Sequence, residues 1–353
     1  MTWSLCMIVK DEEKNINKCL NSAHKLFDEI IIVDTGSTDK TKNIAKKYTK
    51  KIYDYEWIND FSSARNFSFS KATKDYIMWL DADDIIKSKE YAKLKKLKKT
   101  LSDDIDIVML KYEIAHDNNA NPTFTYYRER ILKRTKGYKW QDKVHEYIPL
   151  TGKVIKEDIT ITHDKIFKGN SERNLNIYEK MEKNKETFTP RNLYYYGREL
   201  YDHRRYEKAI EVLEKFINTK KGWVEDNINS CYLISNSYYL LNLNEKVLMW
   251  LFKTFEYNTP RKKACCLIGD YFLNNKKYEN AIYWYNQAIG LPVYNGVGFN
   301  EPDYNYFIPY INLCVCYYRL GDYKKSRHYH MLCKEIKPND SIVKQNSSFF
   351  NNL

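Results

Sequence analysis

Tyr76-Ile-Met-Trp-Leu-Asp81-Ala-Asp83-Asp84 is the stretch of this sequence that decides the fold. An apolar run of strand length ends in three carboxylates, and open α/β sheets bind their ligands at the carboxyl ends of strands. Such carboxylates suit Mg²⁺ or Mn²⁺, whose other positions are filled by phosphate oxygens and water. The alternative is that these aspartates begin the Lys-rich helix predicted over 88–100, because Asp and Ser are ordinary helix caps. The stretch alone leaves both interpretations open.

The segments before this stretch alternate between strand and helix patterns. Apolar strands are predicted over 2–9, 29–33 and 51–55, with helices between them and after the last. Apolar residues on both faces of 29–33 favour a covered parallel sheet, so the pattern predicts a doubly wound α/β domain with a nucleotide in its crevice. Neither GxxxxGK[ST] nor GxGxxG occurs, which disfavours a P-loop enzyme, a kinase or an ordinary dehydrogenase.

Length and composition set wider bounds. A chain of 353 residues fits two domains. The net charge of +12 comes from 58 basic residues mixed with 46 acidic ones, so it gives little support to a nucleic-acid partner. The eight cysteines are scattered without a CxxC motif, which favours a reducing compartment. No stretch has the pattern of a membrane span or a signal peptide, and we predict a cytoplasmic protein.

Four motifs together resemble one known family. They are Met7-Ile-Val-Lys-Asp11-Glu12, Val33-Asp34-Thr-Gly-Ser-Thr-Asp39, Asp60-Phe-Ser-Ser-Ala-Arg65-Asn66 and Leu80-Asp81-Ala-Asp83. In order and spacing they resemble the family 2 glycosyltransferases of the GT-A fold, over roughly residues 1–165. The resemblance implies an inverting transfer of a sugar from a nucleotide donor, usually UDP-linked, with Mn²⁺ or Mg²⁺ on the Asp-x-Asp motif.

The same resemblance assigns roles position by position. It places Val9, Glu12 and Asp34 at the base and ribose, Asp81 at the ribose, Arg65 at the nucleotide and its diphosphate, and Asp83 on the metal. Many relatives have two acids after the second strand, whereas Thr35 follows Asp34 here, which leaves the identity of the base open. Asp84 then falls outside the donor site, and we expect it to lead the following helix.

The segment that follows a fifth predicted strand, at 106–111, offers further candidate residues. Val144-His145-Glu146 on an alternating strand would point His145 and Glu146 to opposite faces, so we expect one of them inside. This segment resembles the branch of the family that joins a sugar transferase to helical repeats, including S-glycosyltransferases of bacteriocin peptides. We therefore expect Glu146 as the catalytic base with Asp142 behind it, His145 at the diphosphate or metal, and His163 as a late metal ligand.

A basic cluster precedes that segment. It consists of Arg128, Arg130, Lys133, Arg134 and Lys136 on a strand-like stretch. Arg128 or Arg130 would clamp a diphosphate, or the cluster would form a solvated strand face, and the second interpretation is slightly favoured.

The second half changes to long helical patterns with internal repeats. Segments beginning near 190, 228, 262 and 307 recur at close to the 34-residue period of tetratricopeptide repeats, with a loop at 292–306 stretching the last interval. We predict a GT-A domain over 1–165, a connector over 166–189 and an all-α repeat domain over 190–345. Such repeats stack into a groove that holds a peptide or a partner protein.

The leading hypothesis is an inverting, metal-dependent hexosyltransferase that moves a sugar from a nucleotide-sugar to a protein or peptide docked by the repeats. One alternative is a transferase that extends a lipid-linked or cell-surface glycan, with the repeats serving to form a homodimer. An alternative of another class is a non-catalytic scaffold with a degenerate transferase domain. The donor sugar, the acceptor atom and the oligomeric state stay open.

Overall fold

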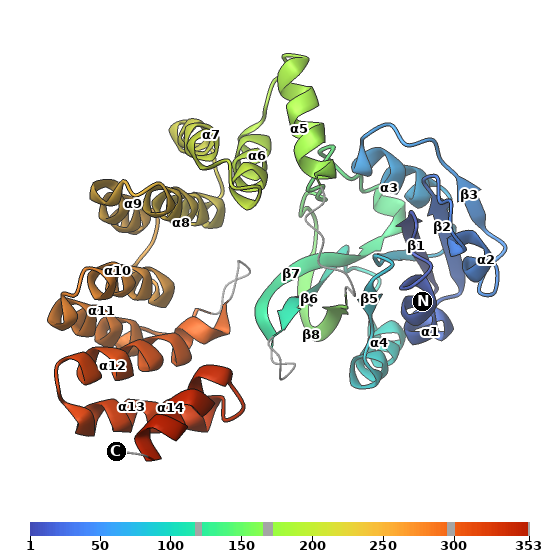
Figure 1. The fold of residues 1–353 in the computed structure, drawn as a ribbon. Coiled ribbons are helices and arrows are strands. Elements are labelled where there is room, and N and C mark those ends of the chain that lie inside the picture. Colours follow the sequence, from blue (N-terminus) through green and yellow to red (C-terminus); the bar gives the residue numbers. More distant parts are fainter. Residues whose placement is uncertain (117–121, 165–171, 295–300, 352–353) are drawn as a thin grey trace. The chain divides into compact units, whose positions relative to one another are not determined.

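A computed structural model describes residues 1–116, 122–164, 172–294 and 301–351, and the chain divides into two compact units (Figure 1). The N-terminal unit comprises 1–115 and 125–181, and the repeat unit comprises 116–124 and 182–353. Parts of three segments lie outside the described residues: the polar stretch 117–122, which its sequence marks as a turn, the start of the predicted connector and the loop at 292–306.

An eight-stranded, mixed sheet organises the N-terminal unit, in the order β3-β2-β1-β4-β7-β6-β8-β5. β1 pairs in parallel with β2 and β4, and β2 pairs in parallel with β3, as the strand and helix alternation predicts. β7 joins β4 antiparallel, while β8 runs parallel to β6 and antiparallel to β5. The strands are β1 (Trp3–Val9), β2 (Glu29–Asp34), β3 (Ile52–Asp54), β4 (Tyr76–Trp79), β5 (Asp84–Ile85), β6 (Ile107–His116), β7 (Pro122–Lys133) and β8 (Val154–His163).

Both faces of this sheet are buried. On β1, Leu5 and Met7 join a cluster with Leu20 of α1, while Cys6 between them joins a second cluster with Phe69 of α3. Two buried faces explain why the central strands are apolar runs without alternation. The helices that belong to this unit are α1 (Ile16–Ala23), α2 (Thr41–Ala45), α3 (Phe61–Ser70), α4 (Ser88–Thr100) and most of α5 (Arg173–Lys183).

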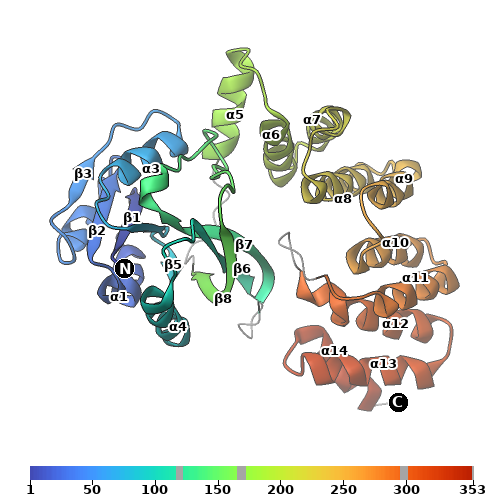
Figure 2. The same cartoon turned by 180° about the vertical axis from the view of Figure 1, so that it is seen from behind.

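Paired helices make up the repeat unit, as predicted, and Figure 2 shows them in succession from behind. Gly197 and Gly269 stand where two helices of a pair touch. A Cβ on Gly197 would lie 2.5 Å from Leu213 Cγ, and one on Gly269 would lie 2.6 Å from Tyr285 Cε1. The helices are α6 (Pro190–Asp202), α7 (Tyr206–Asn218), α8 (Val224–Leu240), α9 (Val247–Lys253), α10 (Lys262–Asn274), α11 (Tyr278–Gly290), α12 (Phe307–Arg319), α13 (Tyr323–Ile336) and α14 (Ser341–Asn351).

Hydrogen bonds join the first helix of one pair to the first helix of the next pair, and their spacing in the sequence equals the repeat length. Asn229 Nδ2 donates to the hydroxyl of Tyr194 at 2.8 Å, and Asn274 Nδ2 donates to that of Tyr239 at 3.4 Å. Both pairs are 35 residues apart. That spacing agrees with tetratricopeptide-like repeats. Within the described ranges, no helix has the length and apolar character needed to cross a membrane.

Candidate functional site

A cavity of about 390 Å³ opens at the carboxyl ends of β1 and β4. The strand order reverses between these two strands, since β2 and β3 lie on one side of β1 and β4 lies on the other. Ligands of open α/β sheets bind at such a switch point. The lining residues are Ile8, Val9, Lys10, Glu12, Thr35, Trp57, Phe61, Arg65, Trp79, Asp81, Ala82, Asp83, Tyr112, Tyr126, Arg128, His145, Glu146, His163, Arg173 and Asn174.

Arg65 of α3 links two carboxylates in this cavity. Its Nη2 donates to Asp81 Oδ1 at 2.8 Å, and its Nε donates to Glu146 Oε1 at 2.6 Å. The guanidinium carbon lies 4.9 Å from the ring centroids of both Trp79 and Trp140. Burial by itself raises the pKa of Asp81, but the positive charges of Arg65 and Arg130 outweigh it and hold that pKa below its usual range.

The loop carrying His145 and Glu146 is not a strand. His145 has φ +53°, and the backbones of Gln141 and Tyr147 bond to each other in both directions, which closes a turn. Both His145 and Glu146 therefore line the cavity, and the expectation that only one points inward is wrong. His145 also stacks on Tyr178 of α5, with ring centroids 6.5 Å apart.

Helix α3 fixes the position of this loop. Asn66 Nδ2 donates to Trp140 O at 3.0 Å, and Trp140 N donates to Asn66 Oδ1 at 2.9 Å. The backbone N–H of Phe61 donates to Lys143 O at 2.9 Å, and Asp60 caps α3 through Ser63 N. The motif around Arg65 thus also holds the loop that faces it.

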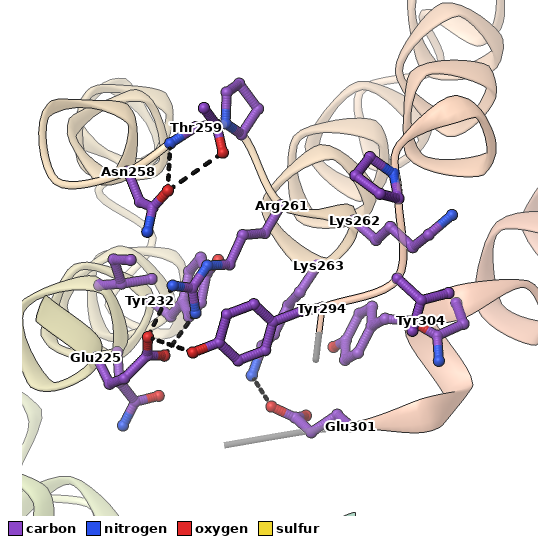
Figure 3. A pocket seen from close by; sticks show the side chains of 16 residues that line it. Glu225, Tyr232, Asn258, Thr259, Arg261, Lys262, Lys263, Tyr294, Glu301 and Tyr304 are labelled. Carbon is purple, nitrogen blue, oxygen red and sulfur yellow. Dashed lines mark hydrogen bonds and ion pairs between the residues drawn. The ribbon is translucent and has the colours of Figure 1, made fainter. Parts of the chain in front are cut away.

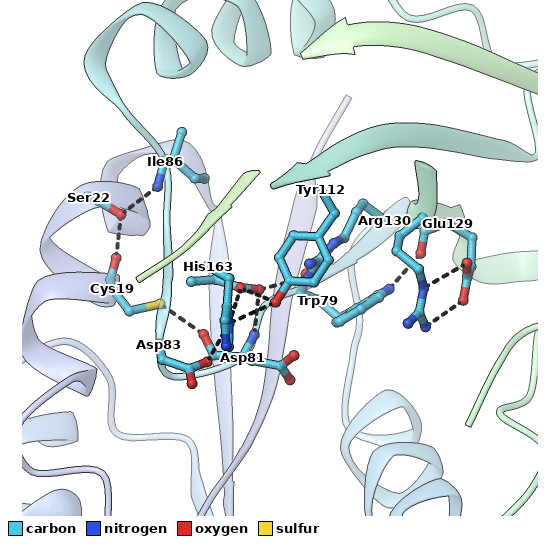
Figure 4. A network of polar contacts seen from close by, with 12 residues as sticks. Cys19, Ser22, Trp79, Asp81, Asp83, Ile86, Tyr112, Glu129, Arg130 and His163 are labelled. Atoms are coloured by element: carbon cyan, nitrogen blue, oxygen red, sulfur yellow. Dashed lines mark hydrogen bonds and ion pairs between the residues drawn. The ribbon is translucent and has the colours of Figure 1, made fainter. Parts of the chain in front are cut away.

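Asp83, Asp84 and His163 form a cluster whose ligand atoms all lie within 4.8 Å of one another. Figure 4 labels Asp83 and His163 of this cluster. His163 Nδ1 lies 3.3 Å from Asp83 Oδ1 and 3.7 Å from Asp84 Oδ1. Burial opposes a charge on the imidazole, but hydrogen bonds to the two carboxylates raise the pKa of His163 to about 10. Carboxylate oxygens fit Mn²⁺ or Mg²⁺, and His163 would join them as a ligand once a bound ion displaced its proton.

Asp84 does not lead the following helix, because α4 begins at Ser88 and Asp84 lies in β5, bonded to β8. Its side chain is fully buried. It accepts hydrogen bonds from Tyr112 Oη at 2.7 Å, Arg130 Nη1 at 2.9 Å and Asp81 N at 3.0 Å. The expectation that Asp84 leads the following helix is wrong. Its hydrogen bonds hold its carboxylate in a buried position next to Asp83 and His163.

Arg128 and Arg130 do not form a solvated face, which corrects the favoured interpretation of the basic cluster. Arg130 is fully buried between the rings of Trp79 and Tyr112, and Arg128 lines the cavity beside Glu129. Together with Arg65, three guanidinium carbons lie 3.7 to 5.0 Å from the Trp79 centroid. The strand alternation of β7 explains why the two arginines point the same way.

Of the other residues that the sequence predicts for the site, only some line the cavity. Val9 and Glu12 line the cavity, whereas Asp34 and Asp142 are not among its lining residues. Asp34 Oδ1 accepts from the backbone N–H groups of Gly36 and Ser37 at 3.0 and 2.8 Å, while its buried Oδ2 has no partner among the described residues. Thr35, in the next position, lines the cavity instead.

Several cavity residues were not expected from the sequence. Trp57 comes from the segment that leads into α3, and Phe61 is the first residue of that helix. Arg173 and Asn174 come from the predicted connector. The Arg173 guanidinium carbon lies 4.5 Å from the Phe61 ring centroid. The aromatic pair at 57 and 61 was a usable signal, whereas nothing local distinguishes Arg173 from the other charged residues of its segment.

Comparisons with known proteins agree with this geometry. Residues 4–160 match the model of the family described as Glycosyl transferase family 2. The chain is 32% identical over 288 residues to the SPbeta prophage-derived glycosyltransferase SunS of Bacillus subtilis, covering 75% of this chain and 64% of that relative. It is 47% identical over 81 residues to a TPR repeat-containing protein of Synechococcus elongatus, covering 23% of this chain and 20% of the relative.

Among solved structures, glucosyl-3-phosphoglycerate synthase from Mycobacterium tuberculosis, in complex with Mn²⁺ and UDP-glucose, has 23% identity and a TM-score of 0.28. That overlap covers 31% of this chain and 43% of the synthase. The family match, the sheet order and the cavity at its switch point agree with one another. Residues 4–160 thus match glycosyl transferase family 2, and the chain continues beyond them into tetratricopeptide-like helical repeats.

Proposed function

We propose that this protein is an inverting, metal-dependent glycosyltransferase that moves a sugar from a nucleotide-sugar, UDP-linked, to a protein or peptide acceptor. The observation that carries the proposal is the position of Asp83 and His163 beside the Arg65–Asp81 pair, in one cavity at the switch point of the sheet, with Asp84 buried next to them. The matched family supports the reaction class.

The donor lies along the carboxyl ends of β1 and β4. In this proposal Val9, Glu12 and Asp34 surround the base and ribose, Asp81 binds the ribose, Arg65 and His145 face the diphosphate, and Asp83 and His163 hold Mn²⁺ or Mg²⁺. Bound there, the ion would stabilise negative charge on the departing diphosphate. Arg65 and Arg128 add fixed positive charge at the same wall of the cavity. That positive charge stabilises the transition state, in which negative charge has developed on the diphosphate, more than the ground state.

Glu146 is the proposed catalytic base, with Asp142 behind it. Its side chain is 12% exposed, lines the cavity and is held by Arg65 through Oε1. A carboxylate fixed in this way can accept a proton from an acceptor nucleophile that approaches within hydrogen-bond reach.

The repeats dock the acceptor in this proposal, with 1–165 as the transferase domain, 166–189 as a connector and 190–345 as the docking domain. A second groove of about 240 Å³ between α8 and α10 supports it, because it exposes Asn236, Tyr239 and Asn274. Amide and phenol groups of this kind can bond to the backbone of an extended chain. The eight cysteines are all free, which supports action in the cytoplasm.

Mass spectrometry of the products tests the proposal. The protein is incubated with Mn²⁺, mixed UDP-sugars and host lysate, and we expect a hexose on a polypeptide and release of UDP. Asp83→Ala should abolish both, whereas Asp164→Ala, which removes a carboxylate paired with Lys18, should retain them. Sugar on a glycan alone, or release unaffected by Asp83→Ala, would contradict the proposal.

A further inference from the structure

A second cavity lies entirely within the repeat unit (Figure 3). It has a volume of about 360 Å³ and lies at the first turns of α8 and α10, beside the chain that connects α11 to α12. The wall includes Pro292, Tyr294 and Glu301 from the loop that lengthens the last repeat interval of the sequence. Nothing in the proposed transfer reaction uses this cavity.

The charged side chains of its wall are paired with each other. Arg261 donates to both oxygens of Glu225, at 2.5 and 2.8 Å, and Tyr294 Oη donates to the same carboxylate at 2.9 Å. Lys263 forms an ion pair with Glu301. The wall therefore presents donors and acceptors in fixed positions, and four of its five charged side chains form ion pairs, so it suits a neutral polar ligand better than an ion.

Lys262, the remaining cation of the wall, is also engaged. Its Nζ donates to the carbonyl oxygens of Ala288 and Ile289 at 2.8 and 3.0 Å. Figure 3 shows its side chain extending away from the Glu225 and Arg261 pair. An anionic group in the cavity would thus have to break an existing contact to find a cation.

Aromatic rings supply the rest of the wall. Tyr232, Tyr294 and Tyr304 line the cavity, and the Arg261 guanidinium carbon lies 4.2 Å from the Tyr294 centroid. Tyr232 is 9% exposed, and its buried hydroxyl has no hydrogen-bond partner among the described residues. Because that hydroxyl is closed to solvent, Tyr232 contributes its ring to the cavity wall and not a hydrogen bond.

We infer that this cavity binds a neutral saccharide. Sugar rings have apolar C–H faces that pack on aromatic rings, and hydroxyls that both donate and accept, which matches the tyrosines and the paired Arg261 and Glu225. Such a site would retain an acceptor that already carries a sugar. The inference rests on the proposed function only for the source of that sugar, because the binding itself needs no transfer.

Saturation-transfer NMR on the full chain tests the inference, with D-glucose, D-galactose and N-acetyl-D-glucosamine as separate probes and without nucleotide or metal. We expect saturation of the ring C–H protons of at least one sugar. Tyr232→Phe removes only the buried hydroxyl and keeps the ring, so it serves as the matched control and should bind the sugar as the unmodified protein does. Tyr294→Ala should abolish binding.

Two controls separate this site from the others. Tyr239→Phe, in the neighbouring groove, and Asp83→Ala, in the N-terminal cavity, should leave sugar binding unchanged. No saturation with any sugar, saturation that survives Tyr294→Ala, or displacement of the sugar by an unmodified peptide would overturn the inference. Sugar binding by a protein that transfers none would contradict the proposed function and leave this inference standing.

Discussion

Asn66 and Trp140 hold each other through two reciprocal hydrogen bonds, at 3.0 and 2.9 Å, across 74 residues of sequence. This double bond ties helix α3 to the start of the loop that carries His145 and Glu146. The position of the proposed base therefore depends on a residue that is absent from the cavity wall.

Asn66→Ala should lower kcat for transfer roughly tenfold or more, because a small displacement of a catalytic group has a large effect on rate. The two lost hydrogen bonds should also lower the free energy of unfolding by about 2 kcal/mol. Steady-state kinetics and urea unfolding measure the two effects. Ser70→Ala, at the end of the same helix, serves as control, and an equal loss of kcat there would contradict the assignment.

Arg65→Lys should weaken binding of the nucleoside diphosphate by at least about tenfold, since an ammonium cannot bond in a fixed planar geometry to Asp81 and Glu146 at once. Arg65→Lys also loses the guanidinium that lies 4.9 Å from the ring centroids of both Trp79 and Trp140. Calorimetric titration with UDP measures the affinity. Lys71→Ala, which removes a cation stacked on Phe67 at the end of the same helix, should bind UDP normally. Undiminished affinity in Arg65→Lys would show that Arg65 is structural only.

Glu146→Gln separates two roles of this residue. The amide oxygen still accepts a hydrogen bond from Arg65, but it cannot accept a proton from the acceptor. We expect kcat to fall by about a hundredfold or more while the affinity for UDP stays within a few-fold. Retained kcat would mean that Glu146 only positions Arg65.

Manganese should raise the melting temperature of the protein, because an ion that binds only the folded state stabilises it by mass action. His163→Ala and Asp83→Asn should each abolish that increase. Differential scanning calorimetry with and without Mn²⁺ measures it, and Asp164→Ala is the matched control. A manganese response that persists in both variants would exclude the cluster as the binding site.

Asp226 makes the stability of the repeat unit depend on pH. Burial raises its pKa to about 7, despite the nearby Arg191 and Arg198 and with a further increase from Glu225. A carboxyl whose pKa is higher when folded binds more protons in the folded state, so its contribution to stability is present at low pH and is lost as the pH rises from about 4 to about 7.

Asp226→Asn should therefore gain stability relative to the unmodified protein as the pH rises from 5 to 8, by on the order of 2 kcal/mol. Urea unfolding followed by circular dichroism at the two pH values measures the difference. Glu335→Gln, which changes an exposed carboxylate of α13, should show no such change with pH. A difference that stays constant with pH would contradict the buried, protonated state.

The sequence predicts the part of the site that is built from contiguous residues. Val9 ends β1, and Asp81 and Asp83 follow β4, so an apolar run and the residues after it suffice to bring them to one edge of the sheet. The fold class follows for the same reason, because helix and strand periods are local properties.

The remaining contacts are not local, and no short pattern encodes them. Glu146 meets Arg65 across 81 residues, and Asp84 pairs with Arg130 across 46. For Asp84 a local rule was misleading, since an aspartate before a Lys-rich helix has the pattern of a cap, while tertiary contacts place it in β5. The turn at His145 depends on a positive φ that its alternating sequence does not indicate.

Trp79 touches three guanidiniums at the wall of the N-terminal cavity, and Trp57 lines the same cavity. The emission of an indole responds to the charges and the water around it. Entry of a donor would rearrange both, so the protein contains its own optical reporter. Intrinsic fluorescence would then follow donor binding in real time, with no label and no need for an acceptor.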